Sequence, residues 1–127
     1  MSDKPKSTVL VVEDEPLVRM LTTFILRERG FDVLEAGTGA EALDLLAKGH
    51  RVGLILTDVR MPGVDGITLS QRVRSSHPKI PIVFVTGEAA LDKEQLAGIP
   101  CLSKPLTPDE LMAAVNEAIN LNEAEGA

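Results

Sequence analysis

The sequence predicts an α/β fold in which a five-stranded parallel sheet is covered by helices on both faces. Short apolar runs alternate along the chain with amphipathic stretches, and the first run consists only of β-branched and apolar residues, as expected for strands buried on both sides. The chain has 127 residues, of which 44% are hydrophobic, which is enough for one core. We therefore expect residues 1–127 to form a single domain, with a core over 8–121 and loose ends at 1–7 and 123–127.

Five apolar runs are the expected strands. They cover Thr8–Val12, Phe31–Glu35, Val52–Thr57, Ile80–Thr86 and Pro100–Ser103. Right-handed crossovers between them would place helices on both faces of the sheet.

The first helix has a recognisable start and stop. Pro16 suits its first turn, and Gly30 is its expected C-terminal stop. Apolar residues recur at helical spacing between them, which predicts a face buried against the sheet. That face contains Leu17, Met20, Leu21, Phe24 and Ile25.

The later helices follow similar signals. Thr38 with Glu41, and Thr107 with Glu110, predict capping boxes at the start of the second and the last helix. A third helix is expected after the turn at residues 61–66. The fourth helix has room for only about two turns, over residues 90–97.

Composition excludes several classes of function. The 19 acidic and 13 basic residues give a net charge of −6, which would repel a phosphate backbone or an anionic membrane. The aromatic residues are three phenylalanines, so no Trp or Tyr platform stacks on bases. No apolar run reaches the roughly 18 residues of a membrane span, and no signal-peptide pattern is present. We expect a cytoplasmic protein that binds neither nucleic acid nor membrane.

Acidic side chains stand at the ends of two expected strands. Glu13 and Asp14 follow the first strand, and Asp58 follows the third. Ligands of open parallel sheets bind beyond the carboxyl ends of the strands, so these carboxylates converge if the two strands are neighbours. Each acid alone would more simply cap the helix that follows it. Three oxygen ligands together, without His or Cys, favour Mg²⁺ or Mn²⁺.

Two further strand ends carry groups that bind anions. Thr86 and Gly87 end the fourth strand, and Lys104 follows the fifth. A metal ion, a hydroxyl and an ammonium placed around Asp58 would surround a phosphoryl group on three sides. Because a carboxylate can attack phosphorus and form an acyl phosphate, Asp58 is the candidate nucleophile.

The order of these residues resembles the receiver domain of two-component response regulators. The resemblance runs from about Thr8 to Leu121 and rests on four motifs: Val9 to Pro16, Asp58 to Gly66, Thr86-Gly87 and Lys104-Pro105. It implies a flavodoxin-like sheet with strand order 2-1-3-4-5. It also implies a signalling module that accepts a phosphoryl group on Asp58 from a sensor histidine kinase or a histidine phosphotransfer protein. The change in its surface would then be read by a downstream protein that the sequence does not identify.

The resemblance also implies a role for each site residue. Glu13, Asp14, Asp58 and the backbone carbonyl of Arg60 would hold Mg²⁺. Thr86 would be the switch hydroxyl, and Lys104 the phosphate-binding lysine on a peptide bond to Pro105 that is commonly cis in the family. Arg60 and Glu88, two positions beyond Asp58 and Thr86, would modulate the lifetime of the phosphate.

Cys101 departs from the family pattern. Three positions before the lysine, receivers usually carry Tyr or Phe, and the single cysteine stands there instead. Phe84-Val85-Thr86-Gly87 resembles variant receivers with a Phe-Ala-Thr-Gly-like motif, which also lack the aromatic. We therefore expect switching through Thr86, with Cys101 as a small apolar residue.

Two other functions compete with the signalling module. A metal-dependent phosphatase or phosphotransferase with an aspartyl nucleophile needs a second carboxylate near that nucleophile, and the residue two beyond Asp58 is Arg60. We therefore expect no enzyme beyond slow self-dephosphorylation. The third possibility is a constitutive scaffold that is never phosphorylated, against which the complete set of site residues argues.

Overall fold

The computed structural model describes residues 8–87 and 92–126 and contains the predicted parallel sheet. The strands are β1 (Thr8–Val12), β2 (Asp32–Ala36), β3 (Leu54–Asp58), β4 (Ile82–Thr86) and β5 (Cys101–Ser103). All four pairings are parallel, and the order is β2-β1-β3-β4-β5. The predicted order is confirmed. β1 and β3 are neighbours, so their ends meet at one edge of the sheet.

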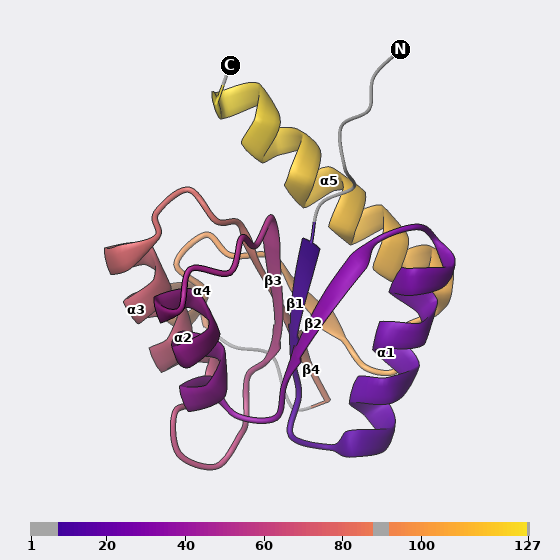
Figure 1. The fold of residues 1–127 in the computed structure, drawn as a ribbon, viewed down its shortest axis with the longest axis horizontal. Coiled ribbons are helices and arrows are strands. Elements are labelled where there is room, and N and C mark those ends of the chain that lie inside the picture. The colour runs from indigo at the N-terminus through magenta and orange to yellow at the C-terminus, as the bar shows by residue number, and fades with distance from the viewer. Residues whose placement is uncertain (1–7, 88–91, 127) are drawn as a thin grey trace.

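Helices cover both faces of the sheet (Figure 1). On one face lie α1 (Pro16–Glu28) and α5 (Pro108–Gly126), and on the other lie α2 (Gly39–Ala47), α3 (Gly66–Ser76) and α4 (Lys93–Leu96). Alternate residues of a strand point to opposite faces. In β1, Val9 and Val11 therefore pack with α1 and α5, whereas Leu10 and Val12 pack with α2 and α3. The two buried clusters share the sheet as their common wall.

Side-chain caps fix the starts of the helices where the sequence predicted them. The Glu41 amide donates to Thr38 Oγ1 (3.0 Å), and Thr107 and Glu110 exchange two hydrogen bonds of 3.0 and 3.1 Å. These bonds to Thr107 lower the pKa of Glu110. Among the described residues, no helix is long and apolar enough to cross a membrane.

β1 begins at Thr8 as predicted, whereas the other four strands begin one or two residues later than predicted. β4 starts at Ile82, because Pro81 has no amide for the ladder and the Ile80 amide donates to His77 O (3.1 Å) in a turn. The predicted loose N-terminus falls outside the described residues. At the other end α5 continues to Gly126, where the sequence predicted a frayed segment.

Helix α4 is also shorter than the two turns predicted. It begins at Lys93 because Asp92 and Gln95 exchange backbone-to-side-chain bonds of 2.8 and 3.1 Å. It ends at Leu96 because Ala97 (φ 49°) and Gly98 (φ 82°) adopt left-handed conformations. Residues 88–91, where part of the predicted helix falls, lie outside the described residues.

The predicted buried face of α1 is wrong. Four of its five members are the exposed large apolar residues of the described chain: Leu17 (76%), Met20 (60%), Leu21 (60%) and Phe24 (60%). The helix instead turns Thr23 and Leu26 into the molecule, with Val18, Thr22 and Ile25 half-buried. Amphipathic spacing finds a stripe, but it does not say whether the sheet or a partner covers that stripe.

Candidate functional site

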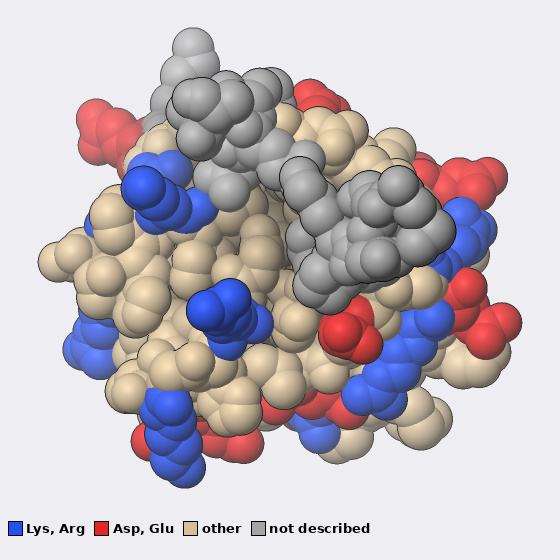
Figure 2. Space-filling model, turned by 45° about the horizontal axis from the view of Figure 1, so that its top comes forward, with Lys and Arg blue, Asp and Glu red and all other residues tan. Residues whose placement is uncertain are grey.

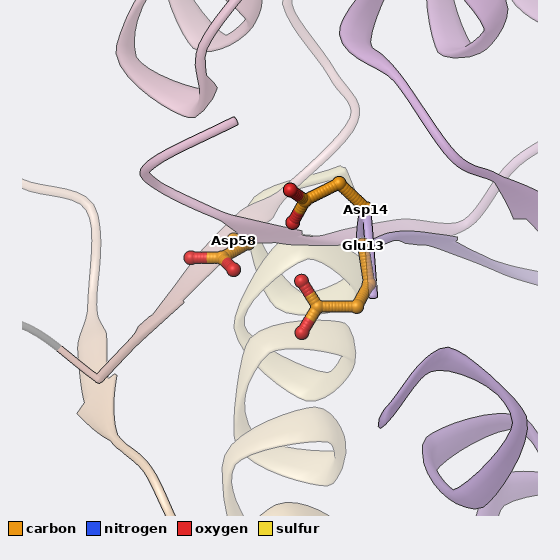
Figure 3. A group of neighbouring side chains, drawn as sticks. All are labelled: Glu13, Asp14 and Asp58. Carbon is orange, nitrogen blue, oxygen red and sulfur yellow. The ribbon is translucent and has the colours of Figure 1, made fainter. Parts of the chain in front are cut away.

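Three carboxylates meet at the carboxyl ends of β1 and β3. Glu13 and Asp14 follow β1, Asp58 ends β3, and one carboxylate oxygen from each lies within 4.8 Å of the others. Figure 3 shows the three side chains around one common space. Glu13 is buried, whereas Asp14 and Asp58 are half-buried. The predicted convergence is therefore present in the structure.

Lys104 joins this cluster from the end of β5. Its Nζ donates to Glu13 Oε1 (2.5 Å) and to Asp58 Oδ2 (2.9 Å). Burial acts to lower the pKa of Lys104, but the hydrogen bonds to both carboxylates and their charges outweigh it and raise the pKa above 10.5. The ammonium is therefore a fixed cation between two acids.

Glu13 is the carboxyl group of the cluster whose pKa is raised. Burial, followed by a hydrogen bond with Asp58, raises the pKa of Glu13 from 4.5 to about 7, although Lys104 opposes the shift. Its Oε2 is buried and has no hydrogen-bond partner among the residues that the structure describes. A buried acceptor without a partner, beside two more carboxylates, suits a hard divalent cation with oxygen ligands, and Mg²⁺ is the ion that this donor set favours.

Backbone contacts fix the position of Asp58. A β-carbon at Gly66 would lie 2.2 Å from Asp58 O, so only glycine lets the start of α3 pack this closely. The Gly66 amide donates to Val59 O (2.8 Å), and Asp65 caps α3 by accepting from the Thr68 amide (2.8 Å). The turn that follows the acid is thereby closed onto the end of β3.

The remaining predicted residues lie around the cluster at different depths. Thr86 is buried at the end of β4, and its carbonyl accepts from the Lys104 amide (2.8 Å). The peptide bond between Lys104 and Pro105 is cis, as the resemblance implied. Arg60 is exposed, and Glu88 lies outside the described residues.

Cys101 is half-buried and packs against the cluster formed by α2, α3 and the sheet. Burial raises the pKa of its thiol. A thiol in this environment is less reactive than a free one, which agrees with the prediction of a small apolar residue.

The contact between Arg19 and the backbone of Glu13 was not predicted from the sequence. From the first turn of α1, Nη1 of Arg19 donates to Glu13 O (2.7 Å), beside the acid cluster. The only signal in the sequence is an arginine one turn beyond the strand-end acids. An exposed helix arginine gives the same signal.

The exposed apolar stripe of α1 (Leu17, Met20, Leu21 and Phe24) reaches this site at Leu21. Leu21 also lines a cavity of ≈260 Å³ that is bordered by Asp58 and Lys104. The rest of the cavity wall is mostly apolar, from α1, the sheet and the segment after β5. An apolar surface therefore adjoins the carboxylates.

Comparisons with known proteins agree with this geometry. The model of the response regulator receiver domain family matches residues 9–116. Sensor kinase CckA of Brucella abortus (strain 2308) is 39% identical over 118 residues, which are 89% of this chain and 12% of the kinase. Sensor histidine kinase RcsC of Escherichia coli (strain K12) is 37% identical over 113 residues, which are 86% of this chain and 12% of that kinase. The chain thus spans a small part of these relatives.

A solved structure extends the similarity to the fold. The crystal structure of a response regulator receiver domain protein (CheY-like) from Methanospirillum hungatei JF-1 has a TM-score of 0.87 and 27% sequence identity. The match covers 94% of this chain and 98% of that one. The observed strand order and helix placement are therefore those of a known receiver.

Proposed function

Because the chain belongs to the response regulator receiver domain family, we propose that it is a phosphorylation-switched signalling module with Asp58 as its phosphoacceptor. The observation that carries this proposal is the position of Asp58. It lies within a three-carboxylate cluster and accepts a hydrogen bond from Lys104 at 2.9 Å. In this role the protein relays a signal and is not itself an enzyme, apart from slow self-dephosphorylation.

The proposed transfer moves one phosphoryl group from nitrogen to oxygen. A carboxylate oxygen of Asp58 forms a bond to phosphorus while the bond to the donor's histidine nitrogen breaks, and the imidazole leaves with that electron pair. The Lys104 ammonium, which already contacts Asp58, then donates a hydrogen bond to a phosphoryl oxygen. Glu13 and Asp14, with Asp58 and the Arg60 carbonyl, would hold Mg²⁺, which when bound would offset the negative charge of the phosphoryl oxygens.

Thr86 supplies the proposed switch. Its hydroxyl is at the end of β4, two strands from β1, and a new phosphoryl oxygen on Asp58 accepts a hydrogen bond from it. This bond draws Thr86 and Gly87 toward the site and biases the short helix α4 between two arrangements. A downstream protein that prefers one of these arrangements reads the signal.

The exposed stripe of α1 is the proposed docking surface for the phosphodonor, a sensor histidine kinase or a histidine phosphotransfer protein. The donor's histidine must reach Asp58, so part of the donor must cover the edge of the sheet beside α1. Leu17, Met20, Leu21 and Phe24 form an apolar surface there, and such surfaces mark protein interfaces. An apolar partner helix suits this stripe.

Incubation with Mg²⁺ and acetyl phosphate, followed by measurement of the intact mass, tests the phosphoacceptor. The wild-type chain should gain the mass of one phosphoryl group, and Asp58→Asn should not, whereas Asp44→Asn on the exposed face of α2 should behave as wild type. A wild-type chain that gains no mass is instead a constitutive scaffold. An Asp58→Asn chain that still gains it has another acceptor.

A second experiment tests the docking surface with two donors. Leu17→Ser with Met20→Ser should slow transfer from a phosphorylated histidine phosphotransfer protein that phosphorylates the wild-type chain. The same variant should accept phosphate from acetyl phosphate at the wild-type rate, because a small donor needs no docking surface. Equal rates for the variant and the wild type with the protein donor would contradict docking on α1.

A further inference from the structure

Arg19 turns inward from α1 and connects three elements of the fold. Its Nη1 donates to the backbone carbonyl of Glu13 (2.7 Å), just after β1, and its Nε lies 3.5 Å from Oε1 of Glu35 on β2. The Arg19 side chain is 24% exposed, so its position is defined by these contacts more than by water.

The hydrogen bond from Arg19 holds the backbone of Glu13 in place at its carbonyl group. β1 ends at Val12, yet the Glu13 amide still donates to Ala36 O (3.0 Å). The Glu13 carbonyl, on the other side of the same residue, accepts from Arg19. Because the amide and the carbonyl of Glu13 are both hydrogen-bonded, the direction of the Glu13 side chain is fixed. The position of the Asp14 backbone, which follows directly, is fixed with it.

The turn after β2 leaves space for this arginine. A β-carbon at Gly37 would lie 3.1 Å from Arg19 Nη1 and 3.3 Å from Glu41 Oε1. Any side chain at position 37 would therefore press on the guanidinium. The site of Arg19 is made by α1, by the ends of β1 and β2, and by a glycine.

We propose that Arg19 is a positioning residue for the metal site. It fixes the backbone at Glu13 so that the carboxylates of Glu13 and Asp14 face Asp58 in an arrangement that binds Mg²⁺. This inference rests on the proposed function, because it needs the carboxylates to bind the ion. The proposal predicts that removal of Arg19 weakens the binding of Mg²⁺. Simple electrostatics predicts the opposite, because removal of a cation beside acids would strengthen the binding of Mg²⁺.

Mg²⁺ titration of the unphosphorylated chain, by calorimetry or NMR, tests the proposal on Arg19→Gln. The affinity should fall about tenfold, the lower end of the effect of removing a group that orients metal ligands. Arg27→Gln is the matched control, because Arg27 also lies on α1, donates to a backbone carbonyl (Val33 O, 3.3 Å) and loses the same charge. Arg27→Gln should bind Mg²⁺ as the wild type does. Arg19→Lys, which can still donate to the Glu13 carbonyl, should recover part of the loss.

Amide exchange in the absence of metal gives a second readout. Arg19→Gln should speed exchange of the Glu13 amide, while Arg27→Gln should not. The proposal is overturned if Arg19→Gln binds Mg²⁺ as well as, or better than, the wild type. It is also overturned if affinity falls while exchange at Glu13 stays unchanged. A wild-type chain that binds no Mg²⁺ refutes the proposed function, and the exchange measurement still decides whether Arg19 fixes Glu13.

Discussion

The pH dependence of stability should depend on Glu13. Burial and the neighbouring Asp58 raise the pKa of Glu13 from 4.5 to about 7, so between these pH values the folded chain holds a proton that the unfolded chain has lost. The free energy of unfolding must then fall as the pH rises through this range. At about 1.4 kcal/mol per pKa unit, the loss is about 3 kcal/mol, a large part of the stability of a domain of this size.

Urea unfolding at pH 5 and pH 8, in the presence of a chelator, measures this loss. Glu13→Gln should remove it, so the variant should be the more stable of the two proteins at pH 8. Glu15→Gln, which changes an exposed acid two positions away, should keep the wild-type profile. Added Mg²⁺ should restore wild-type stability at pH 8, because an ion that binds only the folded state stabilises it. Parallel profiles of the wild type and Glu13→Gln would refute the assignment.

Three further predictions concern α1, the switch and the phosphate lifetime. Leu26→Ala should lower the free energy of unfolding by about 2–5 kcal/mol and Leu17→Ala by less than about 0.5 kcal/mol in urea melts, because only Leu26 is buried. Thr86→Ala should still be phosphorylated on Asp58 but should lose the phosphorylation-dependent NMR shifts of α4, which a Cys101→Ser variant should keep. Arg60→Ala should speed the loss of phosphate from Asp58 without changing Mg²⁺ affinity, because the side chain is exposed and the proposed ligand is the backbone carbonyl.

The position of the acid cluster was predictable because strand ends are easy to locate. A buried parallel strand is continuously apolar, so the first acids after Val12 and after Thr57 must stand at the edge of the sheet. The resemblance to receivers then placed β1 beside β3, and the carboxylates met. The hydrogen bond from Lys104 to Glu13 spans 91 positions in sequence. It forms because both residues follow the carboxyl ends of strands, which meet at the same edge of the sheet.

Long-range surface properties were less predictable. Figure 2, which brings forward the top of Figure 1, shows basic and acidic side chains interspersed with uncharged ones, so the net charge of −6 is not one acidic face there. Composition gives the sum of the charges, but only the fold gives their arrangement. The predicted length of α4 was too great, because the Asp92–Gln95 cap was not recognised from the sequence as the start of this helix.

The rotation of α1 connects its two proposed roles. Side chains on opposite faces of a helix cannot both meet the sheet, and Arg19 and Leu26 occupy the inner face while the stripe of Leu17, Met20, Leu21 and Phe24 occupies the outer one. Burying that stripe would have turned Arg19 away from the Glu13 carbonyl. The same rotation therefore fixes the acids from within and leaves an apolar surface beside them. A chain that only had to fold would bury its larger apolar residues, so the exposed stripe is best explained by a partner that covers it.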